Sequence, residues 1–179
     1  MKKFLQFSGL IAIVVAVVGI ILMMTTHSVV GASAPNDNWY SGVSAVFGGG
    51  DYKWTLSGFG ISISDVATFN GYPSSSALFA WIFALAATVA LILGAVLPLL
   101  NVKGFTKFAG LVNLCSVLLL ATAGVLLFFT VTNFAGVNSW NSSDNAALGG
   151  GWVVAAILFL AAAVVAICPA LADFVSKKK

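Results

Sequence analysis

Charged residues are scarce in this chain of 179 residues. Its 8 basic residues are all lysine, its 5 acidic residues are all aspartate, and together they make up 7% of the sequence. Hydrophobic residues make up 60%. A soluble domain carries about a quarter charged residues, so this composition excludes a soluble globular protein, and it excludes disorder because too much apolar surface would stay exposed. We expect an integral membrane protein with a single membrane domain, residues 1–179.

Reactive side chains are equally scarce. The sequence has 2 cysteines, Cys115 and Cys168, and 1 histidine, His27. One histidine without acidic or cysteine partners cannot form a metal site, no nucleophile motif frames a serine, and no phosphate-binding loop is present. We therefore expect a protein that is not an enzyme, with no catalytic residues, no cofactor, no metal and no nucleic-acid partner. The two cysteines are expected to be reduced, buried small side chains.

Four apolar runs are long enough to cross a bilayer, which takes about 20 residues. They contain no charge and lack the two-residue alternation of barrel strands, and uncharged spans argue against ion-coupled transport. The fold class is an all-α membrane protein, a four-helix bundle in contact with lipid. The expected helices cover about 4–26, 77–100, 105–132 and 148–174, with an inner loop at 101–107 and outer loops at 27–76 and 133–147.

Lysine placement predicts the orientation. Seven of the eight lysines fall at the chain ends or in the link 101–107, and only Lys53 lies in a long loop. The positive-inside rule makes the lysine-rich side cytoplasmic, so we expect a multi-pass plasma-membrane protein with both termini in the cytoplasm. An alternative is that helix one is a cleaved signal ending at Ala32-Ser33-Ala34, which leaves the other helices in the same orientation.

The two halves of the chain share a pattern. At an offset of 101, residues 2–10 and 103–111 share K-x-F-x-x-F-x-G-L, and the two triple-glycine runs coincide. At an offset of 71, Trp81 aligns with Trp152 and Pro98 with Pro169. These matches predict a tandem 2+2 parallel repeat with a pseudo-two-fold axis along the membrane normal, the alternative being chance similarity between apolar helices.

Small residues are expected to supply close helix contacts, because lipid is as apolar as the helices themselves. Asn113 is the costliest polar residue in the spans. We expect it to form an interhelical hydrogen bond, with a ligand in a polar solute path as the alternative. The expected packing residues are Ala86, Ala90, Gly94, Asn113, Ala162, Ala166 and Ala170.

The first outer loop carries strand-like alternation. Val43, Ala45 and Phe47 alternate with small or polar residues, and a second alternating run shifts phase after Gly58. This pattern predicts a small antiparallel β element, a hairpin over about 39–64 with a bulge at Gly58. Aromatic residues of this loop suit either the interfacial belt or contact with a partner. The candidate contact residues are Trp39, Tyr40, Trp54, Phe59 and Tyr72.

Four spans with a long, strand-bearing first loop resemble the claudin-like tetraspan arrangement. The loop signature of that family consists of a Trp, a Gly-Leu-Trp and two disulfide-bonded cysteines. In this chain Trp39 and Trp54 are present, but neither outer loop contains cysteine. The short lysine-rich ends also resemble small four-span proteins of bacterial membranes. The resemblance implies a fold and a topology, and no activity.

These observations favour a protein that acts by contact. We expect a scaffold, an adhesion or assembly element, or an accessory subunit, working as a homo-oligomer or in a larger membrane complex through its outer loop and helix faces. The alternative is a channel or transporter subunit for a small uncharged solute.

Overall fold

The computed structural model describes residues 2–31, 38–58, 61–96, 108–138 and 146–176. Contacts along the chain divide it into two compact units. The first, called here the helix unit, combines Met1–Ile20, Ile82–Val125 and Ala156–Lys179. The second, the sheet unit, combines Ile21–Trp81 and Leu126–Ala155.

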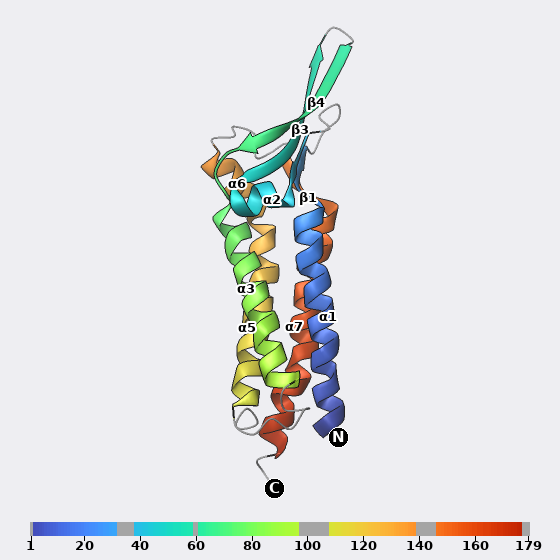
Figure 1. The fold of residues 1–179 in the computed structure, drawn as a ribbon, viewed down its shortest axis with the longest axis vertical. Coiled ribbons are helices and arrows are strands. Elements are labelled where there is room, and N and C mark those ends of the chain that lie inside the picture. The colour runs from blue at the N-terminus through green and yellow to red at the C-terminus, as the bar shows by residue number, and fades with distance from the viewer. Residues whose placement is uncertain (1, 32–37, 59–60, 97–107, 139–145, 177–179) are drawn as a thin grey trace. The chain divides into compact units, whose positions relative to one another are not determined.

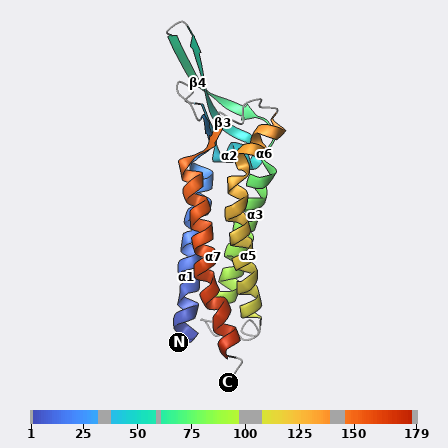
Figure 2. The same ribbon diagram turned by 180° about the vertical axis from the view of Figure 1, so that it is seen from behind.

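Four long helices dominate the described part of the chain (Figures 1 and 2). Each contains a stretch of 19 to 22 residues that is apolar enough to cross a membrane. The four predicted helices are therefore present as candidate membrane spans, and their exposed apolar side chains suit contact with lipid. The helices are α1 (Lys2–Thr25), α3 (Ser75–Leu91) with the π-helical turn η1 (Ile92–Val96), α5 (Ala109–Phe128) and α7 (Gly150–Ser176).

Glycines in the helix unit mark where neighbouring helices touch. At each one, an added Cβ atom would collide with a side chain of the next helix, so the two backbones approach closely. Consecutive helices are adjacent, and α7 returns to α1, so the four helices pack as a ring. The contacts are Gly9 with Ala95 for α1 and α3, Gly94 with Asn113 for α3 and α5, Gly124 with Leu160 for α5 and α7, and Gly19 with Phe159 for α1 and α7.

The predicted small residues of α7 and Gly94 are buried, but Ala86 is exposed and Ala90 is half-buried. An α-helix advances about 100° per residue, so a four-residue series drifts by about 40° at each step. On α7 the drift stays within the buried face, whereas on α3 the series from Ala86 through Ala90 reaches that face only at Gly94. The π-helical turn η1 then shifts the phase again. The face of α3 that is buried steps alternately by three and four residues, through Ala77, Ala80, Ala84, Ala87 and Leu91.

The sheet unit contains one antiparallel sheet of five strands in the order β4-β3-β2-β1-β5. The predicted antiparallel β element is therefore present, and it is larger than expected. Its last strand comes from the second loop of the sequence and pairs with β1. The strands are β1 (His27–Gly31), β2 (Trp39–Ser41), β3 (Gly49–Gly58), β4 (Ile61–Asn70) and β5 (Ala146–Leu148).

Two details of the expected hairpin are wrong. The alternating run from Val43 to Phe47 forms the short helix α2 (Gly42–Phe47). Ser41 caps its start by accepting from the backbone N–H of Ser44, and Gly48 ends it in the left-handed region at φ 77°, so capping residues outweighed the alternation. Gly58 is the last residue of β3 and pairs opposite Ile61, so it ends the strand instead of forming a bulge.

The second loop also holds an unexpected helix. The helix α6 (Thr130–Val137) follows α5 directly after Phe129. The backbone N–H of Phe129 donates to the carbonyl of Leu126, three residues earlier, which tightens the end of α5. Because α6 and β5 both come from this loop, the loop is part of the packed sheet unit.

Candidate contact surface

The β3–β4 hairpin extends beyond the rest of the sheet (Figure 1). β3 pairs with β4 over its full length, from Gly49 opposite Asn70 to Gly58 opposite Ile61. On its other side, β3 pairs with β2 only at Tyr52 and Lys53. Among the described strands, none lies on the far side of β4. The hairpin therefore carries unpaired backbone along β4, and such an edge is a template for another strand.

The exposed middle of β4 shows which backbone groups face this edge. The backbone N–H of Val66 donates to the carboxylate Oδ1 of Asp65 at 2.8 Å, and both residues are exposed. Outward-facing backbone groups alternate along an antiparallel strand, so Ser64, Val66 and Thr68 share the free edge. The carboxylate of Asp65 occupies the N–H of Val66. The N–H groups of Ser64 and Thr68, on either side of it along the edge, stay available to a partner strand.

Trp39 and Tyr40 are engaged within the sheet unit. The ring of Trp39 stacks on His27 with centroids 4.1 Å apart. Tyr40 stacks on Tyr52 at 5.5 Å and meets Phe134 edge-on at 5.0 Å. Burial raises the pKa of the Tyr40 hydroxyl above its usual value, and repulsion from Tyr52 adds to this. These two predicted contact residues therefore help to hold β1, β2, β3 and α6 together.

Among the predicted contact residues whose side chains the structure describes, Tyr72 is the most exposed, at 72%. Its backbone is held from both sides by the side chain of Asn138. Oδ1 of Asn138 accepts from the Tyr72 N–H at 2.8 Å, and Nδ2 donates to the Tyr72 carbonyl at 3.0 Å. A fixed backbone beneath an exposed aromatic ring lowers the entropy cost of binding through that ring.

The side chains of the other two predicted contact residues lie outside the described part of the chain. Trp54 lies in β3, toward the tip of the hairpin, but the described residues do not include its side chain. Phe59 lies outside the described residues. The structure thus places Trp39 and Tyr40 side by side on β2 and Tyr72 separately, just before α3.

Trp152, which the repeat pattern aligns with Trp81, is fully buried. Its indole Nε1 donates to the carbonyl oxygen of Met23 at 2.9 Å, which joins the start of α7 to the end of α1. The neighbouring glycines allow this approach: a Cβ on Gly149 would collide with the carbonyl of His27, and one on Gly151 with Thr26. A run of three glycines such as 149–151 indicates that other backbone approaches closely. It does not identify the residues that are contacted.

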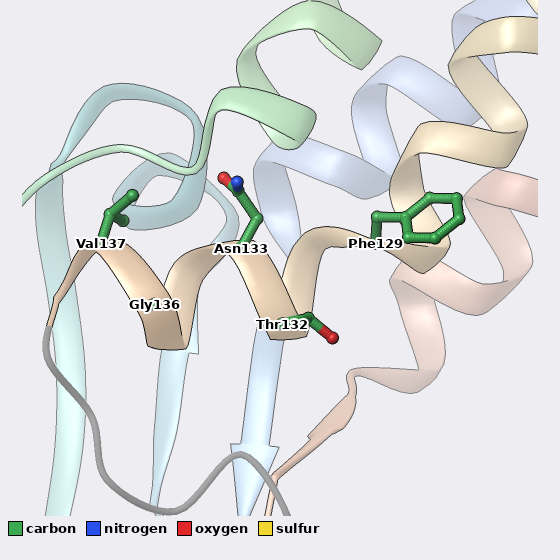
Figure 3. A pocket seen from close by; sticks show the side chains of 5 residues that line it. All are labelled: Phe129, Thr132, Asn133, Gly136 and Val137. Atoms are coloured by element: carbon green, nitrogen blue, oxygen red, sulfur yellow. The ribbon is translucent and has the colours of Figure 1, made fainter.

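A shallow depression of about 340 Å³ follows one face of α6 (Figure 3). Its lining residues recur at the three- and four-residue spacing of a single helix face. Within it, Oδ1 of Asn133 accepts hydrogen bonds from Ser74 at 2.9 Å and Ser75 at 3.1 Å. No pattern in the sequence indicates this surface. It is lined by Phe129, Thr132, Asn133, Gly136 and Val137.

Asn113 forms an interhelical hydrogen bond within the helix unit. Its Nδ2 donates to the carbonyl of Gly94 at 3.1 Å. The asparagine therefore gives a buried backbone carbonyl on the neighbouring helix a hydrogen-bond donor. Oδ1 of Asn113 is buried without a hydrogen-bond partner and packs against Gly94 where a Cβ would be.

The cysteines differ from expectation in part. Both are free, but Cys115 is exposed and Cys168 half-buried, so the expected burial is wrong. Helix surfaces in lipid need not be hidden from solvent by protein, and an apolar thiol suits them. Within the described ranges, no group of three or more histidine, cysteine or acidic side chains could hold a metal ion.

Comparison of the chain with protein-family models, with curated proteins and with solved structures finds no match.

Proposed function

We propose that this protein is not an enzyme and acts by contact, with the unpaired edge of the β3–β4 hairpin as its main binding surface. The observation that carries the proposal is the pairing pattern: ten residues of β3 pair with β4, while β2 covers two of them and no described strand flanks β4. Strand addition at such an edge gains affinity from backbone hydrogen bonds. A scaffold, an assembly element or an accessory subunit would use it in this way.

The lysine distribution supports a cytoplasmic location for both chain ends, with the hairpin on the outer side of the plasma membrane. The claudin-like arrangement is supported only by four spans and a sheet built mainly from the first loop. The ring of helices is compatible with the proposed parallel repeat, because exchanging α1 with α5 and α3 with α7 preserves every neighbour pair. A ring of unrelated helices would have the same neighbours.

The channel alternative receives less support. It relied on Asn113 as a polar ligand along a solute path, but Nδ2 of Asn113 is bonded to the Gly94 carbonyl and its Oδ1 is buried against Gly94. Strand pairing is therefore the better basis for an experiment.

The experiment is site-specific crosslinking in native membranes of a variant whose two cysteines are replaced by alanine. Ser64→Cys and Thr68→Cys place a thiol on the free edge, while Gly150→Cys places one at an exposed site on α7 as the control. We expect the two edge thiols to capture a second copy or another protein, and the control thiol to capture neither. Equal capture at all three sites, or none at the edge, would contradict the proposal.

A proline pair separates edge pairing from hairpin folding. Ser64→Pro removes an N–H that faces the free edge, whereas Asp65→Pro removes one that faces β3. With the thiol at position 68, Ser64→Pro should lower capture by about ten-fold while the protein folds normally, since losing one or two backbone hydrogen bonds has that effect. Unchanged capture would show that the contact does not use this edge.

A further inference from the structure

The helix α6 lies where the membrane span of α5 ends. That span, Ala109–Phe128, has 20 residues, and at about 1.5 Å per residue it is about 30 Å long, the thickness of the hydrocarbon core. Thr130, the first residue of α6, follows two positions later. The start of α6 is therefore at the level where acyl chains meet the glycerol esters of the lipids.

The depression on α6 changes in polarity along the helix. At its start, nearest the span, Phe129 is 58% exposed and follows Phe128, which is 50% exposed. One turn later the lining includes the hydroxyl of Thr132 and the amide of Asn133 (Figure 3). None of the five lining residues is charged. A lipid held there would lay an acyl chain on Phe129 and set an ester against the polar groups one turn later, and Val137 adds apolar surface beyond them.

The amide of Asn133 is oriented for such a ligand. Two serine hydroxyls, those of Ser74 and Ser75, donate to its Oδ1. With Oδ1 engaged, Nδ2 is the part of the amide that can donate to a ligand, and an ester carbonyl is an acceptor. Gly136 provides room beside it, because no atom lies within 4 Å of the position a Cβ would take.

We propose that this face of α6 is a binding site for one membrane diacyl lipid, with an acyl chain over Phe129 and an ester carbonyl on Nδ2 of Asn133. The uncharged lining selects for the ester and acyl region and not for the charge of the headgroup. The site is separate from the strand edge proposed above and does not depend on it. Its lipid would be retained longer than the lipid around the other helices.

The test uses the full-length protein in phosphatidylcholine nanodiscs that contain a trace of phosphatidylcholine with a photoreactive group in one acyl chain. After illumination, mass spectrometry of peptides should show adducts enriched in residues 129–137 relative to the exposed faces of the other helices. Gly136→Trp would fill the depression with an indole ring and remove the contact of one or two lipid methylene groups with α6. The adduct yield should therefore fall by about ten-fold. Gly150→Trp adds the same side chain at an exposed glycine of α7 and should change nothing.

A second variant tests the ester contact. Asn133→Asp keeps an oxygen for the two serine hydroxyls but removes the donor, so the adduct yield at residues 129–137 should fall while the fold is maintained. Replacing phosphatidylcholine with anionic phosphatidylglycerol should change the wild-type yield by less than about two-fold, since the lining has no charge. Adducts no more frequent on α6 than elsewhere, an equal loss with Gly150→Trp, a strong headgroup preference, or a bound polypeptide in place of lipid would each overturn the proposal.

Discussion

Trp152 and Met23, which are 129 positions apart in the sequence, are joined by a hydrogen bond of 2.9 Å from the indole Nε1 to the backbone carbonyl. Carbonyls in the last turn of a helix have no partner within that helix, and Met23 lies in the last turn of α1. The indole therefore satisfies a buried acceptor and fills the space between α1 and α7 at the same time.

Replacing Trp152 with phenylalanine removes the donor and leaves a small cavity. We expect the free energy of unfolding to fall by about 1–3 kcal/mol, measured by thermal or denaturant unfolding in detergent. Trp81→Phe is the matched control, because Trp81 is half-buried and contacts Phe47 edge-on through its ring. Equal losses for the two variants would mean that the indole hydrogen bond contributes nothing.

The triple glycine at the start of α7, residues 149–151, allows alanine substitutions at neighbouring positions to be compared. Gly149→Ala would place a methyl group against the carbonyl of His27, while a methyl group on Gly150 meets no atom within 4 Å. We expect Gly149→Ala to destabilise the protein by about 1–3 kcal/mol and Gly150→Ala to leave stability unchanged or raise it by up to about 1 kcal/mol. Unfolding curves of the two variants check this, and the reverse order would contradict the packing of α7 on β1.

The earlier triple glycine, residues 48–50, also has two outer positions that require glycine, and here backbone conformation is an added reason. Gly48 and Gly50 have φ values of 77° and 119°, a region that other residues rarely adopt. Gly49 has neither a positive φ nor a neighbour within 4 Å. In both triplets the outer glycines are required and the middle one is not. Close contact is the cause at Gly149 and Gly151, whereas at Gly48 and Gly50 a positive φ acts in addition to close neighbours.

Asn113 allows a test of packing inside the helix unit. Asn113→Ala leaves the Gly94 carbonyl without its donor in apolar surroundings, and we expect a loss of about 0.6–2 kcal/mol in unfolding free energy. Thr122→Ala is the control, because the exposed Thr122 hydroxyl bonds only to the Leu118 carbonyl of its own helix. Unfolding in mixed detergent micelles measures both, and equal effects would show that the interhelical bond adds no stability.

Tyr40 predicts a loss of stability at alkaline pH. Its pKa in the folded protein is raised above the usual value of 10.0, first by burial and then by repulsion from Tyr52. Above that usual value the unfolded chain loses the proton while the folded chain keeps it, so the free energy of unfolding falls as pH rises through the folded pKa.

Tyr40→Phe should flatten this alkaline decline, whereas Tyr72→Phe, at an exposed site, should not. Unfolding measured from neutral to alkaline pH checks the prediction, and parallel curves for wild type and Tyr40→Phe would refute it.

The four spans could be predicted from sequence because length and hydropathy decide them without reference to partners. The antiparallel element in the first loop was also predictable, but its extent was not. β5 is only three residues long and pairs with β1 across more than a hundred positions, and no local pattern encodes such pairing. The alternation in Val43–Phe47 does not predict the short helix α2, which depends on the caps at Ser41 and Gly48.

Helix-packing residues were only partly predictable. Small residues at four-residue steps identified a face of α7 that is buried, from Ala162 to Ala170. The same rule placed Ala86 inward, where the structure has it exposed. The face of α3 depends on its crossing with neighbours and on the π-helical turn, neither of which is visible in a spacing. The role of Asn113 was more predictable, because a buried amide in hydrocarbon must find a backbone or side-chain partner.

The pairing of β1 with β5 also limits how the protein can move. β1 begins two residues after α1 ends, and β5 ends two residues before α7 begins. A sliding of one helix past the other would have to break the ladder or shift it by a residue, which would turn each side chain to the opposite face. At this end, α1 and α7 therefore share one axial register, and a piston-like displacement of either helix is blocked while the ladder holds.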